Sequence, residues 1–305
     1  MLSEAIARYV ALNRAMGFKF NNQDRSLRNF AAFAEPCGDG YVGTETVLAW
    51  AAQAPSAAQR RGRLLVVRRF AQHMQAEDKR YEVPPANAFG RAKWQQRMPH
   101  IYTPEEIRLL LQAAAQLTPV GSIRPTTYVT LFALIASTGL RISEALALQL
   151  DHITPAGLRI EQTKFRKSRL VPLHPTARQG LDRYLARRRQ VGGTSRSLFI
   201  SLWGTDLAYS TVYPVFLELM RSIGLRGGPG RPGPCIHDLR HTFAVRVLET
   251  CTGGEAEIGR QILALATYLG HTHPSDTYYY LQATPKLLES IARAGEQQFH
   301  KGGRP

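Results

Sequence analysis

One short interval, from Gly157 to Leu173, departs from the helical pattern that dominates this chain. Its apolar residues have the spacing of β-strands, and they are Leu158, Ile160, Leu170, Val171 and Leu173. Residues 165–168 (Phe-Arg-Lys-Ser) supply a turn between the two runs, so the interval predicts a β-hairpin. A further short strand is expected at Ser197–Ser201. The expected fold class is therefore mainly α with a small β-hairpin or sheet.

The first 82 residues predict a small helical domain, because their apolar residues recur at helical spacing and no stretch alternates for long. The expected helices span residues 3–16, with Ser3 as the capping residue, and Asp24–Phe33, Thr44–Ala52 and Ser56–Gln75. Residues 83–102 lose this pattern and contain Pro84, Pro85 and Gly90. We interpret residues 83–102 as a basic linker between two domains.

A second domain is expected over residues 103–305. Thr103 has the features of a helix cap, Pro104 suits the first helical position, and Glu106 can close a capping box. After an apolar helix the chain breaks at Gly139, and Ser143 is expected to cap the next helix. The helices expected in this domain besides the one that starts at Pro104 are Thr126–Ser137, Ser143–Leu148, Thr176–Arg189, Ser210–Ile223, His237–Thr250, Glu257–Leu269, Ser275–Leu281 and Thr284–Gln297.

The chain is strongly basic. Its 305 residues carry a formal net charge of +16, and the pI is about 10.2, so we expect a polyanionic partner, with nucleic acid favoured over an acidic protein. The basic residues that cluster in the expected helix Ser56–Gln75, in the linker and in the hairpin are candidate contacts to phosphates, although a solvated helix face is the favoured interpretation of any single run. These candidates are Arg60, Arg61, Arg63, Arg68, Arg91, Lys93, Arg166, Lys167 and Arg169.

Cysteine content and hydropathy narrow the class of protein. The three cysteines show no CxxC spacing, which disfavours a disulfide framework or a structural zinc site. The longest apolar run, Tyr128–Ala136, is too short to span a bilayer. The sequence therefore predicts a cytoplasmic protein without a membrane segment.

Two arginines at helix boundaries are candidates for binding a phosphate. Arginine presents a planar fork of donors that matches phosphate oxygens, and Arg141 and Arg240 each lie at a turn or a helix start. His237 lies one helical turn before Arg240, and His271 follows a break at Gly270. Either histidine can donate to a phosphate oxygen or transfer a proton, although a single histidine or arginine is more often structural.

A metal site is the alternative for the same region. His237 and His241 lie four residues apart, as do the histidines of the zinc-protease helix motif. That motif needs a glutamate directly after the first histidine, whereas this chain has Asp238 there and a cationic Arg240 between the histidines. We therefore predict no bound metal and no cofactor.

Tyrosine and lysine complete the candidate chemistry. A tyrosine needs cationic neighbours or a base to act as a nucleophile, and Tyr278, Tyr279 and Tyr280 offer three candidates. Lys164, in the predicted hairpin, could protonate a leaving oxygen, and a simple phosphate contact is its alternative role.

Four motifs in this order resemble those of the tyrosine recombinases, also called the phage integrase family. They are TGLRISEAL from Thr138, TKFRKSRLVPLHP from Thr163, HDLRHTFA from His237 and LGHTHPSDTYYY from Leu269. The resemblance covers the second domain, and the helical first domain is similar to the core-binding domain of the family. The loop RGGPGRPGP from Arg226 resembles integrases of transposon and recombinase-in-trio type.

The resemblance implies a role for each matching residue. The implied catalytic set is Arg141, Lys164, His237, Arg240, His271 and Tyr280, with Glu144 as a supporting acid. Tyr280 would attack a DNA phosphate to give a 3′-phosphotyrosyl bond and a free 5′-hydroxyl, with Lys164 as the general acid. Neither metal nor ATP would be required.

The resemblance also implies the partners of the chain. They would be double-stranded DNA with specific recombination sites and a homo-tetramer on the synapse, with a monomer or dimer in the absence of DNA. The helix expected at residues 284–297 would dock on a neighbouring protomer, and accessory recombinases could take part. The implied process is the integration, excision or transposition of a mobile element.

Three other functions are alternatives for the same residues. A type IB topoisomerase-like enzyme would relax DNA as a monomer without site preference. A sequence-specific DNA-binding protein with an inactive catalytic domain would bind the same substrate without cutting it. A metal-dependent nuclease is a third alternative, which would lose activity with EDTA.

Overall fold

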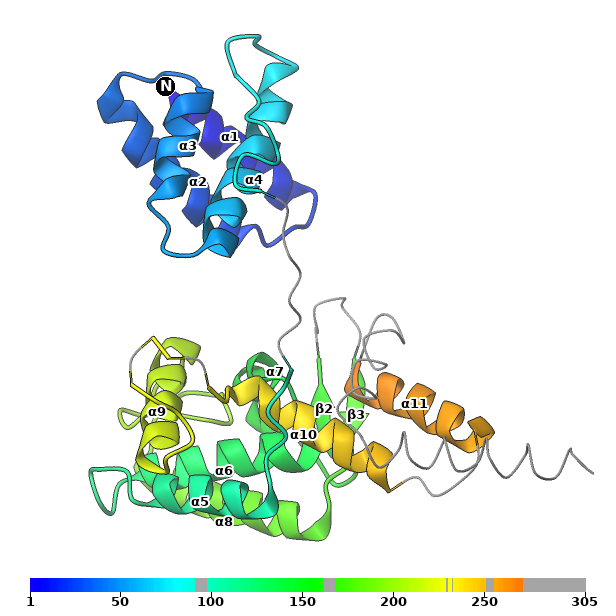
Figure 1. Cartoon of the computed structure of the whole chain (residues 1–305). Coiled ribbons are helices and arrows are strands. Elements are labelled where there is room, and N and C mark those ends of the chain that lie inside the picture. Colours follow the sequence, from blue (N-terminus) through cyan, green and yellow to red (C-terminus); the bar gives the residue numbers. More distant parts are fainter. Residues whose placement is uncertain (91–97, 162–167, 229, 232, 251–254, 271–305) are drawn as a thin grey trace, which may run out of the picture. The chain divides into compact units, whose positions relative to one another are not determined.

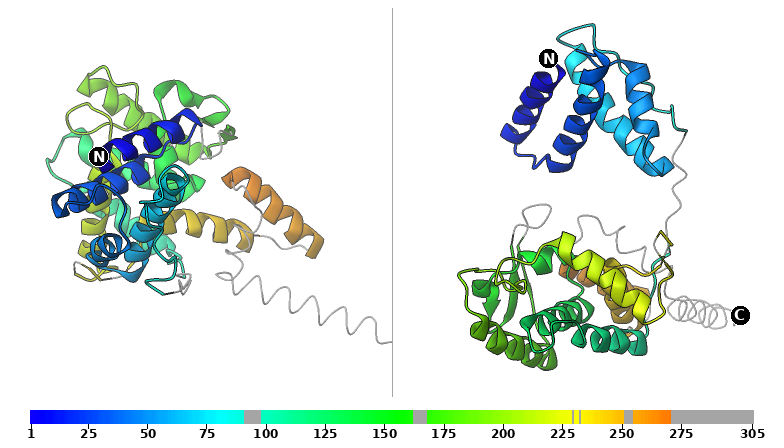
Figure 2. Two further views of the ribbon diagram at one scale, coloured as in Figure 1. Left: turned by 90° about the horizontal axis from the view of Figure 1, so that it is seen from above. Right: turned by 90° about the vertical axis from the view of Figure 1, so that its left-hand side faces the viewer.

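The computed structural model describes residues 1–90, 98–161, 168–228, 230–231, 233–250 and 255–270 (Figures 1 and 2). The chain divides into two compact units, Met1–Gln96 and Arg97–Pro305, each with its own hydrophobic core. Helices dominate both units in the described part, and a small antiparallel sheet lies in the second. The expected fold class is thus confirmed. No described helix has the length and the apolar character needed to cross a membrane.

The first unit is helical throughout its described residues. Its elements are α1 (Leu2–Ala15), α2 (Asn21–Ala34), a short 3-10 turn (Glu35–Cys37), α3 (Thr44–Ala52) and α4 (Ala57–Gln75). The predicted helices are all present, but the capping role of Ser3 is wrong. Met1 is the N-cap residue of α1, and Ser3 lies inside the helix because its N–H (2.8 Å) and its hydroxyl both donate to the carboxylate of Glu35.

The ends of the predicted linker 83–102 belong to the two cores. Val83 and Phe89 pack against the core of the first unit, and Tyr102 is buried in the core of the second. The N–H of Tyr102 donates to the hydroxyl of Thr242 at 2.9 Å, which ties this end of the segment to a helix of the second unit. Residues 91–97, including Arg91 and Lys93, lie outside the described residues.

The second unit begins with the predicted capping box. The N–H of Thr103 donates to Glu106 at 2.8 Å, and the N–H of Glu106 donates back to the Thr103 hydroxyl at 3.1 Å. The described helices of this unit are α5 (Pro104–Ala115), α6 (Ile123–Thr138), α7 (Ile142–Ala147), a 3-10 turn (Leu150–His152), α8 (Pro175–Val191), α9 (Tyr209–Ser222), α10 (Ile236–Glu249) and α11 (Glu255–Leu269). They confirm the predicted helices except those after residue 270, which lie outside the described residues.

The predicted hairpin is present and carries one additional strand. The strands are β1 (Ile153–Thr154), β2 (Gly157–Ile160) and β3 (Arg169–Val171), antiparallel in the order β1-β2-β3. The strand expected at Ser197–Ser201 is wrong, because this segment forms only isolated bridges through Ser197 and Ile200. Its apolar run reflects core packing, since the residues from Leu198 to Ile200 are all buried.

Helix α6 occupies the centre of the second unit. Helices α5, α8 and α10 all contact α6, and α11 packs on α10 (Figure 1). The core around these helices includes Leu131, Phe132, Phe216 and Leu239, all fully or almost fully buried. This packing brings the C-terminal end of α6, the first turns of α10 and the C-terminal end of α11 together.

Candidate active site

The turn at Gly139 places Arg141 in the site. Gly139 follows α6 with a left-handed φ of +63°, and a Cβ atom on it would lie 2.5 Å from Cδ1 of Phe243. Both the backbone and the space therefore require glycine. Arg141 is itself the N-cap residue of α7, so the predicted cap at Ser143 is wrong. The helix begins earlier because Glu144 accepts a hydrogen bond from the N–H of Arg141 at 3.0 Å.

Glu144 lies at the centre of a cluster of arginines. Its side chain is 6% exposed, and its oxygens accept from Arg141 Nη1 at 2.8 Å and from both Nη atoms of Arg169, at 3.1 and 2.8 Å. Arg240 Nη1 lies 4.0 Å from the same carboxylate. Three guanidinium groups around one carboxylate leave an excess of two positive charges in this cluster, which favours an anionic ligand.

The charge state of Glu144 follows from these contacts. Burial alone would raise the pKa of the carboxyl, but the hydrogen bonds and charge of Arg169, followed by the contacts of Arg141, lower the pKa of Glu144 to about 2. Glu144 is therefore ionised at neutral pH. It can orient Arg141 without competing for a proton during a reaction.

Arg240 is buried where the three helix ends meet. Only 1% of its side chain is exposed, its Nη1 donates to the carbonyl of Gly139 at 2.7 Å, and its Nη2 donates to the carbonyl of Leu269 at 2.8 Å. Arg141 Nη1 donates to the same Leu269 carbonyl at 3.4 Å, and Arg141 Nη2 donates to the carbonyl of Gly270 at 3.4 Å. The two predicted phosphate-binding arginines therefore converge at the end of α11.

The start of α10 is fixed by a set of buried hydrogen bonds. Asp238 Oδ2 accepts from the N–H of Cys235 at 2.8 Å and closes the N-terminal box of the helix. The Thr242 hydroxyl donates to the Asp238 carbonyl at 2.8 Å and accepts from the N–H of Tyr102 at 2.9 Å. Arg246 Nη2 donates to the Tyr102 carbonyl at 2.8 Å. These contacts hold the helix that carries both His237 and Arg240.

His237 lies at the exposed edge of the site. Its ring packs edge-to-face on His241, with the ring centroids 4.5 Å apart. Desolvation by the surrounding protein and then the positive charge of Arg240 lower the pKa of His237 below its usual value, although the side chain still contacts solvent. The neutral imidazole is thus favoured at neutral pH, a state that can accept a proton.

The histidine pair does not form part of a recognisable metal site within the described residues. No group of three or more His, Cys, Asp or Glu side chains is arranged there to hold a metal ion. The predicted absence of a metal remains a prediction, because His271 and His273 lie outside the described residues.

Three of the predicted catalytic residues, Lys164, His271 and Tyr280, lie outside the described residues, as do Arg166 and Lys167. The described residues next to two of these segments are in contact. A Cβ atom on Gly270, which precedes His271, would lie 3.0 Å from Arg169 Nη1, and Arg169 begins the strand that follows the 162–167 segment. The described residues Arg169 and Gly270 therefore meet at the arginine cluster.

Several arginines of α4 contact main-chain carbonyls of their own unit. Arg60 donates to Ala54 at 2.8 Å, Arg61 donates to Gly90 at 3.1 Å, and Arg68 donates to Pro84. These contacts fix the loops beside the helix, a role that charge clustering in the sequence does not reveal. Binding of phosphates by Arg60, Arg61 and Arg68 remains a prediction.

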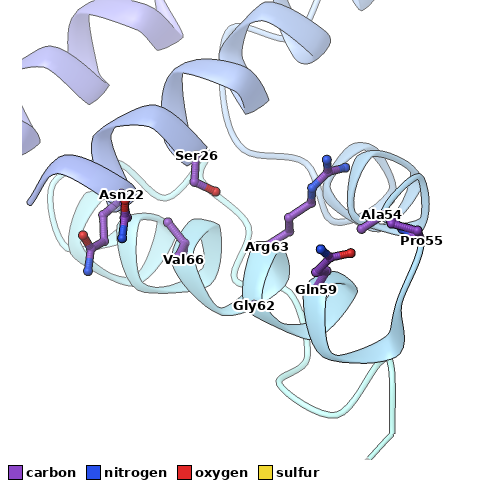
Figure 3. Close-up of a pocket in the computed structure, with 9 residues that line it drawn as sticks. Asn22, Ser26, Ala54, Pro55, Gln59, Gly62, Arg63 and Val66 are labelled. Atoms are coloured by element: carbon purple, nitrogen blue, oxygen red, sulfur yellow. The ribbon is translucent and has the colours of Figure 1, made fainter. Parts of the chain in front are cut away.

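Arg63 borders a hollow of about 430 Å³ between α2 and α4, lined by apolar and polar residues (Figure 3). Its guanidinium donates to the Trp50 carbonyl at 3.1 Å and lies 5.0 Å above the Trp50 ring, which fixes the side chain in place. Asn22, Ser26 and Gln59 contribute amide and hydroxyl groups to the hollow. Sequence reasoning missed it, because single polar residues on separate helices give no signal until the helices are packed.

Residues 101–286 match the profile of the Phage integrase family, which covers more than half of the chain. The chain belongs to the phage integrase family. Its predicted family is thereby confirmed, and the chain is a tyrosine site-specific recombinase, an enzyme of DNA recombination.

Relatives of this recombinase extend the match beyond the second unit. The integrase/recombinase homologue y4rB of Sinorhizobium fredii is 38% identical over 97% of both chains. The tyrosine recombinase XerD of Mycobacterium tuberculosis is 30% identical over 64% of this chain and 60% of its own.

Solved structures share the fold of the recombinase. The Tn1549 transposon integrase in complex with transposon right end DNA gives a TM-score of 0.62 at 16% identity, over 97% of this chain and 98% of its own. A lambda integrase dimer bound to a core site gives a TM-score of 0.61 at 20% identity, over 92% of this chain and 76% of its own. These likenesses support the fold of both units.

Proposed function

We propose that this recombinase cuts and rejoins DNA strands through a 3′-phosphotyrosyl bond to Tyr280. The observation that carries the proposal is the convergence of Arg141 and Arg240 on the Leu269 carbonyl from two separate helix starts. Guanidinium groups that share one acceptor are placed to bind neighbouring oxygens of a single phosphate. The excess positive charge around Glu144 supports the same ligand.

Each predicted catalytic residue has a role in the cleavage of the DNA strand. The Tyr280 oxygen forms a bond to phosphorus while the bond from phosphorus to the 5′ oxygen breaks, and Lys164 gives its proton to that leaving oxygen. Arg141 and Arg240 stabilise the negative charge on the phosphorane, because such charge is bound best by preorganised donors. Neutral His237 can accept the tyrosine proton or hold it in a hydrogen bond, and His271 would donate to a phosphate oxygen.

The reaction stores the energy of the broken bond in the phosphotyrosine. A free 5′-hydroxyl from a partner strand can then reverse the step, so the proposed chemistry uses no metal and no ATP. Four protomers on two specific sites would carry out the exchange, joined by the helix expected at residues 284–297. A lambda integrase tetramer bound to a Holliday junction supports this assembly by analogy.

The similarity to the Tn1549 transposon integrase favours the movement of a mobile element as the biological process. The same proposal includes accessory recombinases, a monomer or dimer in the absence of DNA, and a cytoplasmic location.

We extend the proposal to the first unit, where the hollow beside Arg63 contains side chains of the types that can recognise DNA bases. Asparagine and glutamine amides match the major-groove edge of adenine, and arginine matches that of guanine. Asn22, Gln59 and Arg63 line the hollow together, and the Arg63 guanidinium also donates to the Trp50 carbonyl. Base recognition is therefore proposed for the hollow.

A nicked suicide substrate from the end of the mobile element tests the chemistry. Wild-type protein should form a covalent adduct that survives SDS and is unaffected by EDTA. Tyr280→Phe should form none, whereas the matched variants Tyr278→Phe and Tyr279→Phe should still form it. An adduct in Tyr280→Phe would overturn the nucleophile, and loss of cleavage with EDTA would point to a metal-dependent nuclease.

The same assay separates the two remaining alternatives. A type IB topoisomerase-like enzyme would form the adduct as a monomer and relax plasmids of unrelated sequence. A DNA-binding protein without activity would shift the substrate in a gel and form no adduct. Our proposal predicts an adduct that depends on site sequence and products in which strands of two sites are joined.

A further inference from the structure

The guanidinium of Arg169 faces the carboxylate of Glu144 rather than solvent. Both of its Nη atoms donate to Glu144, at 3.1 and 2.8 Å, and its side chain is 13% exposed. Its Nε atom is buried and has no hydrogen-bond partner among the described residues. The donors that could bind a phosphate are thus committed to a carboxylate or turned away from solvent.

We propose that Arg169 is a positioning residue that holds the Glu144 carboxylate in place and thereby sets the orientation of Arg141. The proposal rests on the function given above, because it assigns Arg169 a role in the same site. This positioning role replaces the phosphate contact that the basic sequence of the hairpin suggested for Arg169. Arg169 acts through Glu144 and need not touch DNA.

The geometry of the pair explains why an arginine is needed. The two parallel hydrogen bonds fix the plane of the carboxylate, which a single contact cannot do. With this plane fixed, Oε1 meets Arg141 Nη1 at 2.8 Å and Oε2 accepts from the Arg141 N–H at 3.0 Å. Arg240 Nη1 remains at 4.0 Å, outside hydrogen-bond range of the carboxylate.

Loss of Arg169 would leave the Glu144 carboxylate free to change in two ways. The carboxylate could turn toward Arg240 and neutralise a guanidinium that the phosphate needs, or the carboxylate could take up a proton. The charged and titratable groups that face Glu144 are Arg141 on its own helix, Arg169 on β3, and Arg240 and His237 on α10. Among the acids and bases of this set, Glu144 and His237 are the groups that would titrate between pH 4 and 8 once Arg169 is removed.

Arg169 also links the hairpin to the end of α11. It begins β3, which follows the segment that contains Lys164, and its Nη1 lies against Gly270. A side chain on Gly270 would enter this space, since its Cβ atom would come within 3.0 Å of Nη1. The same guanidinium therefore connects three chain segments that are far apart in the sequence.

The test compares Arg169→Ala and Arg169→Lys with Arg159→Ala on the same sheet. Arg159 is a matched control because it forms an exposed ion pair with Glu161. We expect Arg169→Ala to slow formation of the covalent adduct about 10- to 100-fold, a typical effect for a residue that supports a ligand-binding group. Arg169→Lys should recover part of the rate, and Arg159→Ala should be unchanged.

A pH profile distinguishes positioning from general support of the fold. Between pH 7 and 5 the rate of Arg169→Ala should fall more steeply than that of the wild type, because Glu144 becomes protonated. In a Glu144→Gln background the Arg169→Ala change should add little further loss and no additional pH dependence. A loss that is the same at every pH and adds fully to that of Glu144→Gln would overturn the proposal.

Failure of this inference differs from failure of the proposed function. If wild-type protein forms no adduct with Tyr280, the function itself is wrong. If the wild type forms the adduct and Arg169→Ala does so at the wild-type rate and with the wild-type pH profile, only the role of Arg169 is wrong. Should Arg169→Ala not fold, Arg169→Lys at pH 5 and 7 gives the same comparison.

Discussion

Arg141 and Arg240 donate to one shared acceptor, the carbonyl oxygen of Leu269, at 3.4 and 2.8 Å. Two like charges lie this close because Glu144 supplies the opposite charge beside them. The main-chain oxygens of Gly139 and Leu269 accept hydrogen bonds from Arg240 and so fix the orientation of its guanidinium group. The arginines are thus oriented before any phosphate binds, which reduces the cost of ordering them.

The first prediction concerns the fork of Arg240. A lysine cannot reach both the Gly139 and the Leu269 carbonyls, so Arg240→Lys should lower the rate of adduct formation by at least about 100-fold, the scale of losing one preorganised donor. Arg246→Lys is the matched control on the same helix, because among the described residues Arg246 contacts one main-chain carbonyl, that of Tyr102, through Nη2 alone. Equal rates for the two variants would contradict the prediction.

The second prediction concerns the turn at Gly139. Gly139→Ala combines the cost of a left-handed φ with a contact of 2.5 Å to Phe243. We expect it to lower the free energy of unfolding by at least about 1 kcal/mol more than Gly121→Ala. Gly121 also has a positive φ, +80°, but a Cβ atom there meets nothing within 4 Å. Urea denaturation of both variants measures the difference, and equal losses would show that Phe243 moves aside.

The third prediction concerns the protonation of His237. Desolvation and the charge of Arg240 lower its pKa, so an NMR titration should place its midpoint below the usual value of 6.5. The signal is assigned by its absence in His237→Gln. Arg240→Gln removes one cause of the shift and should move the midpoint upward. A midpoint at or above 6.5 in the wild type would contradict the predicted lowering of the His237 pKa.

The fourth prediction concerns stability in acid. Because the folded state lowers the pKa of Glu144 from 4.5 to about 2, its ionised form stabilises the fold above pH 4.5. That contribution, on the order of 3 kcal/mol at most, should be lost as the pH falls from 4.5 toward 2. Urea denaturation between pH 6 and 3 measures it. Glu144→Gln should remove this component, and an unchanged pH dependence would contradict the assignment.

The fifth prediction concerns the contact between Tyr102 and α10. Thr242→Val removes the buried acceptor of the Tyr102 N–H and the donor to Asp238. We expect a loss of about 1–3 kcal/mol in the free energy of unfolding, the cost of an unsatisfied buried group. Thr250→Val is the control, since the exposed Thr250 hydroxyl donates only within its own helix. If both variants lose the same stability, the Tyr102 contact contributes nothing specific.

Local signals in the sequence predicted much of the fold. The capping box at Thr103 and the alternation around Leu158 are set by neighbouring residues, and both features are present. The caps at Ser3 and Ser143 were wrong because Glu35 and Arg141 supply tertiary or helix-start contacts that outweigh intrinsic preference. Short-range patterns cannot anticipate such partners.

The candidate site was also predicted in part from the sequence. Residue chemistry predicted Arg141, His237 and Arg240, the family resemblance added Glu144, and the structure brings all four together. The part played by Arg169 was not predicted, since the residue lies in a run of basic residues whose charges look equivalent. Only the packing of β3 against α7 shows that this guanidinium faces a carboxylate.

The division of the chain into Met1–Gln96 and Arg97–Pro305 has a practical consequence. The arginine cluster and His237 belong to the second unit, whereas the hollow beside Arg63 belongs to the first. We expect that grafting the first unit of a relative onto this second unit would change the DNA sequence at which the enzyme acts. The catalytic residues of the second unit would not have to be changed.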